Sequence, residues 1–192
     1  MHLHGISTAT PTSAQLTPSA RYTRTAVWLH WLLGFALLGQ IMFGFMLDEI
    51  APRATPARSG VINLHKSLGI VLGMLIAVRL CWRLSHTPPP WPATMGEFER
   101  RAARAMHAAL YVCMVVMPLS GYIASNFSRF GITFFGMAWP PWGPPLPAVY
   151  AFFNGVHVTT AMIFTALIAG HMLAALKHAV LDRDGIFGRM RN

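Results

Sequence analysis

Four long apolar segments limit what this chain can fold into: residues 26–47, 61–84, 105–125 and 150–179. Each has about 20 residues or more, the length with which an α-helix crosses the hydrocarbon core of a bilayer. With 54% hydrophobic and 11% charged residues, the chain of 192 residues is too apolar for an ordinary soluble domain. Because backbone groups in lipid must be paired within their own segment, the sequence predicts an all-α membrane protein, a bundle of four transmembrane helices.

The basic residues predict the orientation of these helices. If the segments alternate in direction, 11 of the 15 Lys and Arg residues fall on one side of the membrane. The other side holds only Arg53, Arg58, Lys66 and Arg129. Since short loops rich in Lys and Arg are retained in the cytoplasm, both termini are expected to be cytoplasmic. The net charge of +9 is therefore mostly a signal of topology, and no nucleic-acid-binding motif accompanies it.

The chain divides into three expected parts. Residues 1–20 are rich in Ser, Thr, Ala and Pro without apolar periodicity, which predicts a disordered tail. Residues 21–182 hold the transmembrane domain, and residues 183–192 predict a basic cytoplasmic tail. The outer loop 126–148 is aromatic and rich in Pro and Gly, so it is expected to lie on the membrane surface or to cover the outer end of the bundle.

The last apolar segment carries His157 and His171, which are 14 residues apart. A helix turns 100° per residue, so this spacing returns a side chain to within about 40° of its first direction and about 21 Å further along the axis. The two imidazoles are therefore expected on one face, near opposite leaflets of the membrane. Matched by depth, His65 is the outer partner of His157, whereas His30 and His107 both compete for His171 on the cytoplasmic side.

Further residues fall on the same faces. Arg79 follows His65 by 14 residues, where it would suit a haem propionate or simply obey the positive-inside distribution. Gly69 and Gly73 would leave space for a flat macrocycle, and helix contact through small residues explains them equally well. His178 is expected at the cytoplasmic interface.

Imidazoles on facing helices are suitable axial ligands for haem iron, and two of them leave no open position, which favours electron transfer. The intramembrane histidines show no CxxC or HExxH spacing of a zinc site. A proton relay would need intramembrane carboxylates, yet all six acidic residues lie outside the apolar segments. Cys81 and Cys113 lack the CxxCH spacing of covalent haem attachment. The pattern therefore predicts a b-type cytochrome with two haems.

At this point the sequence resembles the bacterial cytochrome b561 family over residues 21–182. The motifs that carry the resemblance are TAVWLHW, VINLHKSLGIVLGMLIAVRL, RAMHAALYVCMVVMPLSGYI and GVHVTTAMIFTALIAGHMLAALKH. The resemblance implies two bis-histidine haem b groups in the bacterial inner membrane, His30 with His171 inside and His65 with His157 outside. His107 then becomes the unliganded histidine, and His178 matches a histidine of the family's quinone site. A lysine of the family's inner loop has no clear counterpart here.

The resemblance also implies an activity. A short stand-alone type of family member oxidises superoxide at the periplasmic face and passes the electrons to ubiquinone, and this is the expected function. The alternative is a cytochrome b subunit that relays electrons between a partner redox protein and the quinone pool. A transporter without haem would leave the intramembrane histidines unexplained.

Overall fold

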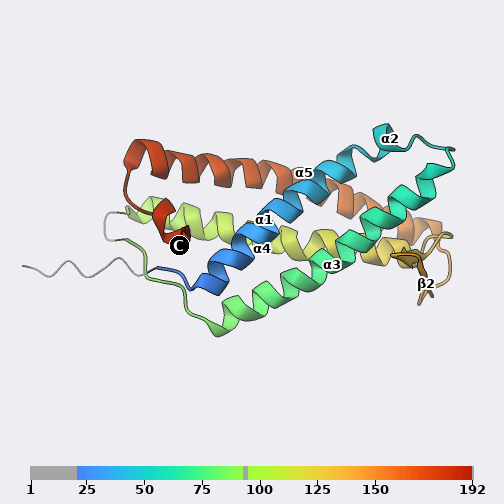
Figure 1. The fold of residues 1–192 in the computed structure, drawn as a ribbon, viewed down its shortest axis with the longest axis horizontal. Helices are drawn as coiled ribbons and strands as arrows, with labels where there is room; N and C mark the ends of the chain where they lie inside the picture. The colour runs from blue at the N-terminus through green and yellow to red at the C-terminus, as the bar shows by residue number, and fades with distance from the viewer. Residues whose placement is uncertain (1–20, 93–94, 192) are drawn as a thin grey trace, which may run out of the picture.

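The computed structural model describes residues 21–92 and 95–191, and it is almost entirely helical (Figure 1). The elements in chain order are α1 Arg24–Phe45, α2 Leu47–Ile50, α3 Ala57–Ser85, α4 Glu97–Asn126, β1 Ile132–Phe134, β2 Met137–Trp139 and α5 Pro147–Lys177. A π-helical turn, His178–Asp182, continues α5, and a 3₁₀-helix follows at Phe187–Met190. The tail expected at 1–20 lies outside the described residues.

The four long helices are long and apolar enough to cross a membrane, as the sequence predicts. They extend beyond the apolar segments at several ends, most clearly in α4, which begins at Glu97 rather than near residue 105. Acidic side chains complement the positive N-terminal end of a helix dipole, and Glu99 also accepts a hydrogen bond from the backbone N–H of Gly96 at 3.3 Å. These interactions stabilise the first turn of α4, although its side chains are polar, so the helix begins before the apolar segment.

The helices pack as a bundle in which α1 lies against α3, α3 against α4, and α4 along α5. A compact apolar core fills the middle of the bundle, and its buried members are Leu33, Leu37, Ile41, Leu72, Ile76, Cys113, Met114, Met117 and Phe164. Phe164 stands seven residues from both His157 and His171 and is only 2% exposed. The core therefore separates two levels of the bundle at which the histidines lie.

The outward faces of the same helices are apolar. Phe35, Phe152 and Leu173 are each about two-thirds exposed, at 67%, 65% and 66%. A continuous apolar exterior on four long helices is the surface that lipid covers. The bundle is thus a multi-pass membrane domain.

Both ends of the described chain lie at one end of the bundle, and α2 and the strands lie at the other (Figure 1). These are called the terminal end and the hairpin end below. The final residues fold back onto the terminal end, because Trp31 donates its indole N–H to the Met190 carbonyl at 2.9 Å. Arg189 is buried and donates to the Pro90 carbonyl at 2.8 Å. The segment expected as a basic tail is therefore packed against α1 and the loop before α4.

The loop 126–148 contains a β-hairpin that the sequence pattern does not reveal. Ile132 pairs with Trp139, and the two-residue turn at Phe135 and Gly136 has positive φ angles of 45° and 91°. Such a turn usually carries Asn-Gly, so Phe-Gly gives a weak signal. The hairpin is fixed to α3, since Ser67 Oγ donates to Thr133 O at 3.2 Å and accepts from Phe135 N–H at 3.0 Å. It therefore covers α3 two residues beyond His65.

Candidate functional site

At the hairpin end, two imidazoles and two glycines form one layer. His65 of α3 and His157 of α5 face each other with ring centroids 6.2 Å apart and perpendicular ring planes. A Cβ atom on Gly44 of α1 would lie 3.1 Å from the His65 ring, and one on Gly121 of α4 would lie 2.8 Å from His157 Nδ1. Each imidazole thus lies against helix backbone that only glycine exposes. These four residues are called the hairpin-end layer.

Both rings of this layer have a partner at Nδ1. His157 Nδ1 is 2.7 Å from the Met117 carbonyl, a hydrogen bond that the absent side chain of Gly121 makes possible. His65 Nδ1 lies 3.2 Å from Gln40 Nε2, and the buried Gln40 amide also donates to the His65 carbonyl at 2.7 Å. The Met117 carbonyl accepts from His157 Nδ1, which fixes that ring and leaves its Nε2 available to a metal, whereas the Gln40 amide is a donor and holds the His65 ring in place.

At the terminal end, three imidazoles and one guanidinium form the second layer. The ring centroids of His30 and His171 are 6.1 Å apart, and those of His107 and His171 are 5.4 Å apart. Arg79 Nη2 lies 3.3 Å from His30 Nδ1, and Nη1 donates to the Ala26 carbonyl at 3.4 Å. These four residues, His30, Arg79, His107 and His171, are called the terminal-end layer. The structure thus brings both competitors for His171 to it.

The two layers are linked by one spacing, because each long helix contributes one residue to each layer, 14 residues apart. The pairs are His30 and Gly44 in α1, His65 and Arg79 in α3, His107 and Gly121 in α4, and His157 and His171 in α5. The sequence prediction used this spacing for the histidines and for Arg79, but it missed Gly44 and Gln40. The spacing of Gly44 from His30 was a usable signal, whereas nothing in the pattern marks Gln40.

The distances within the layers test whether haem fits. Because an imidazole nitrogen lies about 2 Å from a metal that it binds, two rings on opposite faces of one iron have centroids roughly 6 Å apart. The separations of 6.2 Å and 6.1 Å fit this requirement, and 5.4 Å for His107 and His171 is shorter. Two facing imidazole pairs at these separations therefore suit two haem groups.

The remaining predicted residues have clear positions. Gly69 and Gly73 contact helices rather than an open space, since a Cβ on Gly69 would meet Gln40 Nε2 at 3.5 Å and one on Gly73 would meet the Pro118 ring at 3.8 Å. The helix-contact explanation therefore accounts for both. His178 lies just beyond α5 at the terminal end, partly buried, with Nδ1 2.7 Å from Asp184 Oδ2. Cys81 and Cys113 are both free thiols.

Comparison with known proteins identifies the family of this chain. The family model described as prokaryotic cytochrome b561 matches residues 21–192. Cytochrome b561 homolog 2 of Escherichia coli (strain K12) is 31% identical over 88% of this chain and 90% of its own length. Homolog 1 of the same strain is 28% identical over 88% of this chain and 96% of its own.

A further relative is the cytochrome b562 of Cereibacter sphaeroides, which is 26% identical over 91% of this chain and 98% of its own length. These relatives are thus similar along nearly their whole length, and the family model covers all four long helices. The chain belongs to the prokaryotic cytochrome b561 family, whose members are membrane b-type cytochromes that transfer electrons.

Proposed function

We propose that this protein holds two b-type haems, one in each layer, with His65 and His157 as the axial ligands at the hairpin end and His30 and His171 at the terminal end. This proposal rests on the two ring separations, 6.2 Å and 6.1 Å, which both match the roughly 6 Å expected for two imidazoles on opposite faces of one iron. Bis-histidine haem b has no open coordination position and supplies one-electron transfer. His107 is then a neighbour of the inner pair, and Arg79 is the partner for a haem propionate.

The proposed orientation puts the terminal end in the cytoplasm and the hairpin end in the periplasm, across the inner membrane of a bacterium. Eleven of the 15 basic residues support it, because they belong to the segments at the terminal end. The two layers would then connect opposite faces of the membrane, and α5 alone would supply one ligand to each haem.

The proposed reaction is the oxidation of periplasmic superoxide coupled to the reduction of ubiquinone. Two superoxide anions, one ubiquinone and two protons give two dioxygen molecules and one ubiquinol. An outer-sphere electron donor needs no general base at the hairpin end, only access and a favourable field. The cations of the hairpin end supply this field.

These cations are not equivalent. Arg58 and Arg53 share the carboxylate of Asp48, at 2.7 Å and 3.5 Å. Lys66, next to His65, donates to the Gly131 carbonyl at 2.7 Å and has no carboxylate partner among the described residues. The Arg129 guanidinium lies 5.0 Å from the centre of the Phe130 ring, and it likewise forms no ion pair with another described residue. Lys66 is therefore the positive charge that would attract an anion to the outer histidine pair, His65 and His157.

Ubiquinone would be reduced at the terminal end, where His178 is proposed as its hydrogen-bond donor or proton carrier. The imidazole is suited to this role, because it can donate or accept a proton and two carboxylates lie beside it.

Stopped-flow spectroscopy tests the proposed reaction. The purified oxidised protein is mixed with superoxide, with and without ubiquinone, and the haem absorption is followed. We expect rapid reduction that superoxide dismutase abolishes, followed by reoxidation only when ubiquinone is present. Haem that stays oxidised under superoxide would instead support the relay alternative, in which a partner redox protein is the electron donor.

A further inference from the structure

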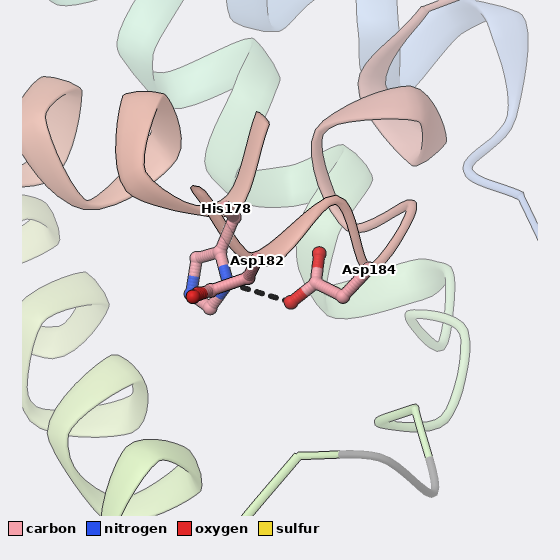
Figure 2. Close-up of side chains that lie close together, drawn as sticks. All are labelled: His178, Asp182 and Asp184. Atoms are coloured by element: carbon pink, nitrogen blue, oxygen red, sulfur yellow. Dashed lines mark hydrogen bonds and ion pairs between the residues drawn. The ribbon is translucent and has the colours of Figure 1, made fainter. Parts of the chain in front are cut away.

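A second group of ligand-type side chains lies at the terminal end, where α5 finishes. His178 and Asp182 begin and end the π-helical turn, and Asp184 follows two residues later. Figure 2 shows the three side chains close together, with the Asp184 carboxylate directed at the His178 ring. His178 Nδ1 lies 3.1 Å from Asp182 Oδ2 and 2.7 Å from Asp184 Oδ2, and one ligand atom of each residue falls within 4.8 Å of the other two.

The backbone explains why a short stretch brings these side chains together. The π-helical turn is wider than an α-helical one, and Arg183 then adopts a left-handed conformation with φ of 49°. This reversal returns Asp184 to the imidazole. Asp184 Oδ1 accepts the Ile186 N–H at 3.0 Å, so its other oxygen stays directed at His178.

The distances are close to those between ligands of one metal ion. Nitrogen and oxygen ligands lie about 2.1 Å from Zn²⁺, so neighbouring ligand atoms of a tetrahedral site are separated by roughly 3.4 Å. The measured separations of 2.7 Å and 3.1 Å are shorter than this value, so an ion would move the ligand atoms apart as it replaced the ion pairs. The side chains are also partly shielded, with exposed fractions of 14%, 29% and 16% for His178, Asp182 and Asp184. An imidazole with two carboxylates is a ligand set that Zn²⁺ accepts, with water completing the coordination.

We propose that His178, Asp182 and Asp184 form a site for a divalent metal ion of the Zn²⁺ type, separate from the haem layers. The HxxxDxD spacing places all three ligands on 7 consecutive residues, 178–184. The site joins the end of α5 to the turn that leads into the packed C-terminal segment. An ion bound there would hold this segment to the terminal end.

Lys177 provides a specific test because it competes for one of the ligands. Its Nζ lies 2.5 Å from Asp182 Oδ2 and 3.5 Å from Glu99 Oε1. An ion that takes Asp182 would leave the lysine to Glu99. Removal of the lysine charge should therefore strengthen metal binding, whereas removal of the carboxylates should weaken it.

The experiment is calorimetric titration of the full haem-loaded protein, without an affinity tag and freed of metal by EDTA, with Zn²⁺. All proteins carry His2→Ala and His4→Ala, so that the N-terminal imidazoles add no sites. We expect one Zn²⁺ per chain. Asp182→Asn with Asp184→Asn should lower the affinity at least about 10-fold to 100-fold, the range known even for partners of metal ligands. Lys177→Gln should raise it, and Asp48→Asn, at the hairpin end, should leave it unchanged.

Two results would overturn the site: no stoichiometric Zn²⁺ binding, or equal affinity in the double variant. The three residues would then be only an ion-paired helix end. The haem spectrum shows whether the double variant folds. If it does not, Co²⁺ is added to the parent protein and to the single variant Asp184→Asn, and the two absorption spectra are compared. The proposed site predicts Co²⁺ ligand-field bands in the parent protein that differ in the single variant. Both proposals use His178, since a metal ion would take Nδ1 and leave Nε2–H to donate to a quinone. Metal binding is measured without superoxide or quinone, so its failure and the failure of the proposed reaction are distinguishable.

Discussion

The two histidine layers have the same spacing along the helices but differ in composition. The hairpin-end layer holds one imidazole pair, His65 and His157, and the other two helices contribute Gly44 and Gly121. In the terminal-end layer the corresponding helices contribute His30 and His107, and α3 adds Arg79. The first layer therefore allows a single pairing, and the second offers a choice.

The difference also extends to the partners of the rings. At the hairpin end the Nδ1 atoms face the neutral groups of Gln40 and Met117, at 3.2 Å and 2.7 Å. At the terminal end Nδ1 of His30 faces a guanidinium at 3.3 Å. Charge near an iron site and hydrogen bonding of its ligands both change a reduction potential. The comparison thus predicts that the two proposed haems respond to different substitutions.

The largest expected effect comes from removing a ligand. His65→Ala should lower the haem content from the proposed two to one per chain, because His157 is the only other imidazole that the described residues place in the hairpin-end layer. His30→Ala should also lose one haem, whereas His107→Ala should keep both. The pyridine haemochrome assay of the purified variants measures this, with His86→Ala, exposed and stacked on Trp82, as the control. Loss of a haem in His107→Ala with retention in His30→Ala would reverse the inner pairing.

The glycines of the hairpin-end layer should give the next largest effect. A Cβ on Gly121 would lie 2.8 Å from His157 Nδ1, so Gly121→Ala must displace the ring and weaken its bond to Met117. We expect partial loss of one haem and a changed spectrum of the remainder. Gly44→Ala, at 3.1 Å, should have a smaller effect, and Gly39→Ala, with nothing within 4 Å, none. Equal haem content and spectra in all three variants would contradict the close approach.

Arg79→Gln should act on the terminal-end haem alone. Loss of the positive charge beside His30 should lower its midpoint potential, on the order of 60 mV for a tenfold change in the equilibrium. Gln40→Leu is the matched variant of the other layer and should shift only the hairpin-end haem. Spectroelectrochemical titration resolves the two transitions. A shift of the same transition in both variants would show that the layers are not separately tuned.

The smallest expected effect concerns the approach of the anion. Lys66→Gln should slow haem reduction by superoxide by a factor of a few and reduce its dependence on salt, because one uncompensated charge is lost. Arg53→Gln is the control, since Asp48 already balances that guanidinium. The two rates are compared at low and high ionic strength. A greater loss in the Arg53 variant would contradict the assignment of Lys66.

The sequence predicted the helices and the levels of the histidines because both follow from simple periodicities. Apolar length defines a span, and a step of 14 residues defines two levels on one face. The role of Gly121 beside His157, and of Gln40 beside His65, depends on how the helices approach each other, which no single segment encodes. The hairpin was missed for a similar reason: its Phe-Gly turn is atypical, and its contacts come from Ser67 of α3.

The cluster at the end of α5 shows the same limit. The sequence places His178 at the interface, but the approach of Asp184 depends on the π-helical turn and on the left-handed Arg183. Neither is marked by residue type. Local backbone geometry, rather than periodicity, therefore creates this group.

Low-temperature electron paramagnetic resonance of the oxidised, full-length protein tests the central claim most directly. Two bis-histidine haems, one in each layer, predict two low-spin ferric signals that together account for two irons per chain, with no high-spin component. His65→Ala should remove one signal and His30→Ala the other. A single low-spin haem per chain, or a high-spin signal of comparable size in the parent protein, would contradict the account.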